Sequence, residues 1–340
     1  MVQMLQRRGL TAMALRLSFS LVAVLLLTAG GRAVAQSAAG TTTKLTISYS
    51  EKVGDNLALW IAVDAGYFAK RGLDVTASFI PAQEGIPALL TGQVQMAAIG
   101  GADAISAAAQ GVKLKYVATF SPVFTFQFWA RPQYANAAAL KGQRIGVSST
   151  TGSLYTATLL ALKQLGLAPS DVAITPLGTV PNVDSALLSG SIVAASSHPP
   201  ATYHYQQQGF VDLVDLAQKR IPNINTGLVA PDTYIRSNPK IVAAVVEAIV
   251  EGFRREKSDK AYAENVMREH MGIKDQAVLD FTYNFYANEV APTLPMPEAG
   301  QLVVAKQALS ARNPKVDTVD LASLIDQTFV KEAAKQLNVK

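Results

Sequence analysis

The sequence predicts an α/β protein made of two doubly wound lobes. Short strands alternate with helices in two separate series, one between residues 45 and 120 and one between residues 144 and 213. This alternation is typical of parallel sheets with helices on both faces. Two extended, β-rich segments follow the two series, Val123–Ala130 and Asn225–Ala230, and we expect them to form hinge crossovers between the lobes.

The first series is clearest in the segment Ala58–Thr76. A short helix ends at Gly66, one further turn ends at Gly72, and a period-2 strand pattern begins at Leu73. Glycine readily adopts the left-handed conformation that ends a helix. The expected strands and helices of this series are Leu45–Tyr49, Asn56–Ala65, Asp74–Phe79, Gly85–Thr91, Met96–Ile99, Ala102–Gln110 and Leu114–Phe120.

The second series repeats this order, and the rest of the chain is helical. Its expected elements are Arg144–Val147, Ser153–Leu165, Ala173–Leu177, Asn182–Leu188, Ile192–Ala195, Pro200–Gln208 and Val211–Leu213. The helices expected after Pro231 are Pro239–Arg254, Asp259–His270, Asp275–Tyr286, Pro297–Ser310 and Leu321–Leu337.

The first 35 residues have the pattern of a cleaved secretory signal. Arginines precede the uncharged apolar run Leu17–Ala29, which is too short to span a bilayer comfortably, and Ala33–Ala35 matches a cleavage site. The pair Arg7-Arg8 is followed by a poor match to the twin-arginine motif, so the ordinary secretion route is favoured. Cleavage removes four of 30 basic residues and none of the 25 acidic ones, which leaves little electrostatic reason for nucleic-acid binding.

Four phrases in the chain resemble the periplasmic solute-binding proteins of ABC importers, in the branch that takes nitrate, sulfonates, taurine and thiamine pyrimidines. They are Ala58–Thr76, Ala88–Met96, Leu140–Val147 and Ala186–Ala194. The resemblance implies a periplasmic-binding-protein-like type II fold. It also implies a discontinuous first lobe, residues 36–125 and 226–340, around a second lobe of residues 126–225.

Loops at the carboxyl ends of the strands are the expected ligand site, because ligands of open α/β sheets bind there. The resemblance places the ligand of this family among the same loops. The candidate ligand-binding residues are Ser50, Asn56, Gln83, Glu84, Gly85, Gly100, Gly101, Ala102, Ser149, Thr150, Thr151, Gly152, Ser153, His198, Pro199, Tyr203, Asn225 and Thr226.

The loop Ser148–Ser153 is the strongest local signal among them. Its hydroxyls and a glycine stand directly before a helix, so side chains, amide N–H groups and the positive helix end can converge on one oxyanion. The alternative is that the hydroxyls merely cap the helix. His198, followed by two prolines, is expected to point toward the cleft, although a lone histidine is often only a hydrogen-bonded residue.

Several classes of site are not supported. The chain has three histidines and no cysteine, and it lacks a P-loop, a dinucleotide-binding fingerprint and a nucleophile elbow. We therefore expect no metal, no cofactor and no enzymatic activity.

The resemblance implies a periplasmic monomer that captures a small organic anion, such as a sulfonate, taurine or a carboxylate, and delivers it to a membrane permease served by a separate ATPase subunit. An enzyme on the same scaffold acting on a small metabolite, or a sensor domain for a membrane receptor, is the alternative.

Overall fold

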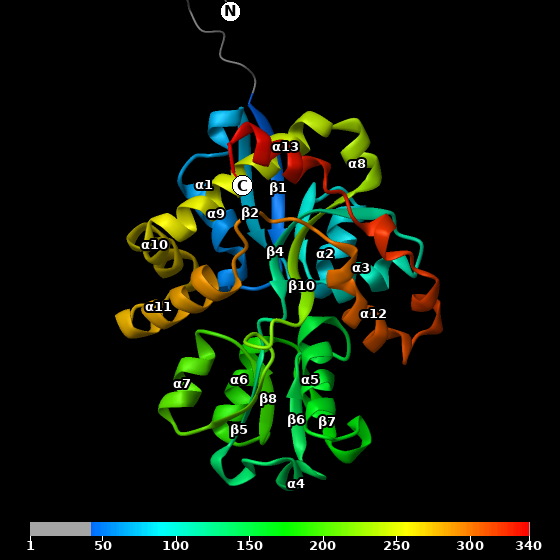
Figure 1. Ribbon diagram of the computed structural model, residues 1–340, viewed down its shortest axis with the longest axis vertical. Coiled ribbons are helices and arrows are strands. Elements are labelled where there is room, and N and C mark those ends of the chain that lie inside the picture. Colours follow the sequence, from blue (N-terminus) through cyan, green and yellow to red (C-terminus); the bar gives the residue numbers. More distant parts are fainter. Residues whose placement is uncertain (1–41, 340) are drawn as a thin grey trace, which may run out of the picture. The chain divides into compact units, whose positions relative to one another are not determined.

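Two five-stranded sheets organise the computed structural model, which describes residues 42–339 (Figure 1). The predicted signal peptide, residues 1–35, lies outside the described residues. The strands are β1 (Thr43–Tyr49), β2 (Leu73–Phe79), β3 (Met96–Ile99), β4 (Leu114–Val123), β5 (Gln127–Ala130), β6 (Arg144–Val147), β7 (Ala173–Pro176), β8 (Ala194–Ser197), β9 (Val211–Asp215) and β10 (Pro222–Pro231).

Each sheet is parallel except for one strand. The first has the order β2-β1-β3-β10-β4, in which only β10 is antiparallel to its neighbours, and the second has the order β7-β6-β8-β5-β9, in which only β5 is reversed. Both reversed strands directly follow a connection from the other sheet. Each of these strands begins at the edge of its sheet where the parallel strands end, so it runs in the opposite direction. The predicted fold class, two α/β lobes joined by two crossovers, is confirmed.

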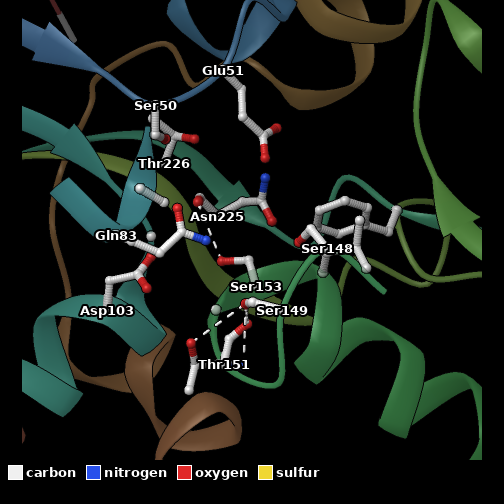
Figure 2. A pocket seen from close by; sticks show the side chains of 15 residues that line it. Ser50, Glu51, Gln83, Asp103, Ser148, Ser149, Thr151, Ser153, Asn225 and Thr226 are labelled. Carbon is white, nitrogen blue, oxygen red and sulfur yellow. Dashed lines mark hydrogen bonds between the residues drawn. The ribbon is translucent and has the colours of Figure 1, made fainter. Parts of the chain in front are cut away.

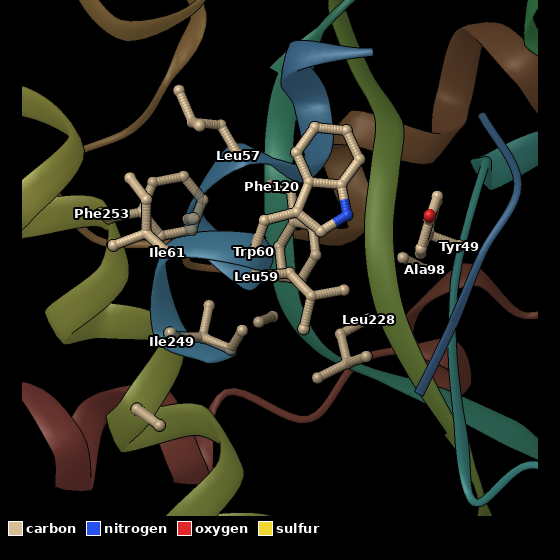
Figure 3. Close-up of a cluster of buried hydrophobic side chains, with 14 of the residues drawn as sticks. Tyr49, Leu57, Leu59, Trp60, Ile61, Ala98, Phe120, Leu228, Ile249 and Phe253 are labelled. Carbon is tan, nitrogen blue, oxygen red and sulfur yellow. The ribbon is translucent and has the colours of Figure 1, made fainter. Parts of the chain in front are cut away.

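Helices cover both faces of the first sheet. Met96 and Ala98 of β3 belong to one buried cluster and Ala97 and Ile99 to another, because successive side chains of a strand point to opposite faces. The first cluster packs against α1 (Leu57–Asp64) and α9 (Pro239–Ser258), and includes the fully buried Trp60 (Figure 3). The second packs against α2 (Ala82–Leu90), α3 (Gly101–Ala108) and α12 (Val303–Ser310).

The second sheet is built in the same way. Phe128 of β5 packs in a cluster with α5 (Gly152–Gln164), whereas the adjacent Trp129 packs with α6 (Val180–Ser189) and α7 (Ala201–Gln207). Phe124, Phe126 and Phe128 are all buried, so ordinary packing accounts for most of this aromatic run.

The helical C-terminal region departs from expectation in places. The predicted helix Leu321–Leu337 is interrupted, because Ile325 forms a parallel bridge with Tyr116 before α13 (Thr328–Gln336) begins. The helix α11 (Gln276–Tyr283) continues as a π-helix through Val290. The sequence analysis missed α4 (Ala137–Leu140) and α8 (Asp232–Ser237) but predicted α10 (Lys260–Met271) within one residue. No helix among residues 42–339 combines the length and apolar character needed to cross a bilayer.

The second crossover lies earlier than predicted. Residues 225–230, expected to cross between the lobes, lie inside β10, where Gly227 pairs with both Ile99 and Thr119. This segment is buried throughout, as a central strand must be. The chain therefore crosses between Asp215 and Pro222 on its second passage, and between Val123 and Gln127 on its first.

Candidate functional site

Two adjoining cavities lie at the carboxyl ends of the strands of both sheets. The smaller one, the inner pocket, has a volume of about 110 Å³ and is lined by residues of both lobes (Figure 2). The larger one, the outer cavity, has a volume of about 530 Å³. The residues that line both are Ser50, Glu51, Ala82, Gln83 and Ser148.

Half of the predicted ligand-binding residues line the inner pocket. They are Ser50, Gln83, Gly100, Ser149, Thr151, Gly152, Ser153, Asn225 and Thr226. His198 lines the outer cavity. The others line neither cavity: Asn56, Glu84, Gly85, Gly101, Ala102, Thr150, Pro199 and Tyr203. Of these, Asn56 donates its side-chain amide to the Glu51 carbonyl, and Tyr203 packs against Phe281.

The hydroxyl-rich loop before α5 is held largely by its own hydrogen bonds. The Ser149 hydroxyl donates to the Thr151 carbonyl at 2.7 Å and accepts from the Thr151 amide at 3.3 Å. Gly152, the first residue of α5, has a φ of 83°, which glycine adopts without strain. The Ser153 hydroxyl lies 3.5 Å from the Asn225 carbonyl, so the loop of one sheet touches the central strand of the other.

Two carboxylates that were not among the predicted ligand-binding residues line the inner pocket. Glu51 lies two residues after β1 and Asp103 lies in the first turn of α3 (Figure 2). Burial and the nearby charge of Glu51 raise the pKa of Asp103 to about 7, which a backbone hydrogen bond at Gly100 only partly opposes. No lysine, arginine or histidine is among the residues that line this pocket.

Asn225 belongs to a buried network around Asp55. Its amide nitrogen donates to the Asp55 carboxylate and to the Thr125 hydroxyl, both at 2.8 Å. The same carboxylate accepts from Ser121 at 2.5 Å and from Thr226 at 3.2 Å. The amide oxygen of Asn225 is buried and has no hydrogen-bond partner within residues 42–339.

His198 is buried at the wall of the outer cavity. Its Nε2 lies 3.4 Å from a Glu51 carboxylate oxygen, and its ring packs against Phe126. Burial alone would lower the pKa of His198. The hydrogen bond and charge of Glu51, together with the charges of Asp55 and Asp184, outweigh burial and raise the pKa to about 9. The imidazole is therefore a cation held among carboxylates.

The sequence contained part of the information needed to predict Glu51, Asp103 and Asp184 as site residues. Glu51 and Asp103 belong to loops that the sequence analysis placed at the carboxyl ends of strands, but the choice within each loop favoured hydroxyls and glycines. Asp184 of α6 lines the outer cavity and accepts from Ser197 at 2.7 Å and from Tyr205 at 2.5 Å. Nothing in the sequence around Asp184 indicated that it would reach the cleft.

Comparisons with known proteins agree with this architecture. The model of a family described as NMT1/THI5 like matches residues 55–257. A search of the curated proteins finds no match to this chain.

Solved structures with the same fold come from several bacteria. A protein from Bordetella bronchiseptica RB50 superposes with a TM-score of 0.74 at 24% identity, covering 87% of this chain and 98% of its own. The periplasmic aliphatic sulphonate binding protein SsuA from Escherichia coli gives 0.69 at 21%, covering 85% and 99%. The periplasmic nitrate-binding protein NrtA from Synechocystis PCC 6803 gives 0.71 at 15%, covering 88% and 90%. These identities establish the fold and not the ligand.

Proposed function

This chain belongs to the NMT1/THI5-like family, and we propose that it is the solute-binding component of an ABC importer. The observation that carries the proposal is the pair of adjoining cavities enclosed by the strand ends of two lobes. Two lobes whose chain connections are two short crossovers can open and close around a solute. Residues of both lobes line the inner pocket, so a bound solute would stabilise the closed arrangement.

The partners follow from that role. The protein would act in the periplasm as a monomer and deliver its solute to a permease in the inner membrane, served by a separate ATPase subunit. Periplasmic neighbours with the same fold support this location. The solute would be released unchanged, and recovering it intact after long incubation separates binding from an enzymatic reaction.

The charge of the solute is a separate question. The predicted organic anion fits the neighbours whose names state sulphonate or nitrate. It fits the lining of the inner pocket poorly, because Glu51 and Asp103 contribute two carboxylates and no basic side chain lines that pocket, although His198 of the outer cavity lies 3.4 Å from Glu51. Like charges at close range raise the free energy of binding.

A thermal-shift screen over amines, sulfonates, carboxylates, nitrate and neutral aromatic compounds tests solute binding. A solute at about 100 times its dissociation constant adds about 2.7 kcal/mol to the stability of the protein, and calorimetry should then give one site per chain. If no compound in any class raises the melting temperature, the proposal loses its support. Uptake of the identified solute by a strain that lacks this gene then distinguishes transport from sensing.

Gly100 provides a variant that blocks the site by geometry. A Cβ at this position would lie 2.6 Å from the Ser153 hydroxyl and 3.2 Å from the Asn225 carbonyl, so Gly100→Ala should weaken solute binding by holding the lobes apart. Gly300→Ala is the matched control, because a Cβ there meets nothing within 4 Å. Equal affinity of the two variants would argue against binding at the inner pocket.

A further inference from the structure

We propose that the solute is a cation whose ammonium or amidinium group occupies the inner pocket and whose apolar, ring-sized part occupies the outer cavity. This inference rests on the proposed solute-binding function and names the chemical class of the solute. The group would be held by the carboxylates of Glu51 and Asp103 and by the amide oxygen of Asn225.

The charge of the inner pocket is unbalanced. Asp103 forms no ion pair within residues 42–339 and lines a pocket without lysine, arginine or histidine. Glu51 has one cationic neighbour, His198, yet its side chain remains 37% exposed. An ammonium or amidinium group supplies both the charge and the N–H donors that two carboxylates require.

Asn225 indicates a hydrogen-bond donor in the solute, independently of charge. This residue is 6% exposed, and its amide nitrogen is committed to Asp55 and Thr125, which fixes the orientation of the side chain. Its amide oxygen is left as a buried acceptor without a donor in the described part of the chain. Buried polar atoms are normally hydrogen-bonded, so this oxygen indicates a solute that donates.

The N-terminus of α5, which suggested an anionic ligand, already faces the carboxylate of Asp103. Asp103 Oδ1 lies 3.7 Å from the point where a Cβ on Gly152, the first residue of α5, would stand. The positive end of α5 therefore faces an acidic side chain of the other lobe. An added anion would meet that carboxylate in the same pocket, whereas a cation would lie between Asp103 and Glu51.

The apolar lining of the outer cavity is the reason for proposing an apolar group in the solute. Phe79, at its rim, is 49% exposed, and the cavity is large enough for a ring. The apolar residues that line it are Val53, Phe79, Pro81, Ala82, Val180, Pro181, Pro200 and Ala201. Because this cavity adjoins the inner pocket at Glu51, one molecule can place its ring in the outer cavity and its charge in the inner pocket.

A matched series of benzene derivatives tests the inference. Benzylamine and benzamidine carry the cation, benzyl alcohol is neutral, and benzoate and benzenesulfonate are anions of similar size. We expect the two cations to raise the melting temperature and the two anions to leave it unchanged. Calorimetry at pH 7.5 should show at least tenfold weaker binding of benzamidine to Asp103→Asn and to Glu51→Gln, and unchanged binding to Glu332→Gln, an exposed acid on α13.

The variants separate binding from folding. Asp103→Asn removes a partly buried carboxylate that lies in the field of Glu51, so its melting temperature without solute should equal or exceed that of the wild type, and lost binding cannot then be ascribed to unfolding. Stabilisation by the anions in preference to the cations would overturn the inference and leave the solute-binding function intact. Cation binding that ignores both substitutions would overturn it as well. If no benzene derivative binds, the solute is not a ring-bearing cation. The proposed solute-binding function is then tested by the broader thermal-shift screen alone.

Discussion

Asp55 links the strands β4 and β10 through side-chain hydrogen bonds. It lies directly after the β1 loop and is 5% exposed, and it accepts hydrogen bonds from Ser121 of β4 and from Asn225 and Thr226 of β10. Burial raises the pKa of Asp55, while the hydrogen bonds from Ser121 and Asn225 and the charge of His198 act in the opposite direction. A buried carboxylate with three donors holds the amide of Asn225 in place at the inner pocket.

Asp55→Ala should therefore destabilise the protein strongly. Ser121 and Thr226 would lose their acceptor and Asn225 would keep only Thr125, and unsatisfied buried groups cost about 1–3 kcal/mol each, so we expect a loss of about 2–5 kcal/mol in the free energy of unfolding. Chemical denaturation measures this. The control Asp74→Ala, at an exposed position in β2, should change stability by less than about 0.5 kcal/mol. Similar losses in the two variants would show that the network has no stabilising role.

The pH dependence of cation binding should follow Asp103. Its pKa lies near 7 because of burial first and the Glu51 charge second, and a bound cation requires the ionised form. Below about pH 7 a proton competes with the cation, so affinity for benzamidine should rise from pH 5.5 to pH 7.5 and then level off. His198, with a pKa of about 9, stays charged over this range.

Calorimetry across that pH range checks the sign of the dependence. Asp103→Asn should bind weakly and nearly independently of pH. Affinity that instead falls as pH rises from 5.5 to 7.5 would show that binding requires a protonated group, and would contradict a role for ionised Asp103.

At the scale of elements, α1 and α9 approach each other unusually closely. A Cβ on Gly252 of α9 would lie 2.2 Å from the Ala58 carbonyl of α1, so only glycine fits this helix crossing. The crossing lies in the buried cluster that contains Trp60 and Phe253 (Figure 3).

Gly252→Ala should separate these two helices. Overpacking a well-packed core costs about 1–3 kcal/mol, and because the obstacle is backbone we expect the upper part of that range. Thermal unfolding measures the loss, with Gly300→Ala as the control in open space. A stability equal to that of the control would mean that α9 can shift without cost.

The sequence predicted most elements because their limits are set locally. The strands β3 and β6 begin and end at the predicted residues, since short apolar runs between glycine-rich turns define them. The helix predicted at Leu321–Leu337 failed for a tertiary reason, because Ile325 pairs with Tyr116 and the helical pattern is broken there. Likewise, the sequence pattern of an extended apolar run such as Asn225–Ala230 does not distinguish a crossover from a central strand.

The site was predictable as a set of loops but not as a set of contacts. Strand-end loops follow from topology, and Ser50, Gln83, Gly100 and Asn225 do line the inner pocket. Which side chain of a loop turns toward the cleft depends on packing between lobes. Asp103 faces α5 because α3 and α5 meet across the cleft, and the sequence of either helix contains no sign of the other.

At the scale of the whole molecule, the lobes are already in contact at the inner pocket. Gly100 and Ser153 approach so closely that a Cβ on the glycine would overlap the serine hydroxyl. Within residues 42–339, the chain passes between the sheets at residues 124–126 and 216–221. Under the proposed function, we expect a molecule with two short crossovers and a small pocket between its lobes to open when it admits a solute, and the solute should then favour the closed state.

The absence of cysteine from all 340 residues makes this motion directly measurable. Spin labels on Leu90→Cys and Ser189→Cys, exposed sites on α2 and α6, report the separation of the lobes. We expect a saturating solute to shift their distance distribution toward shorter values and to narrow it. Labels on Leu90→Cys and Lys70→Cys, both near the first sheet, should not respond. An unchanged distribution between the lobes at saturation would mean that the solute binds without closure, and the crossovers would then be rigid connections rather than hinges.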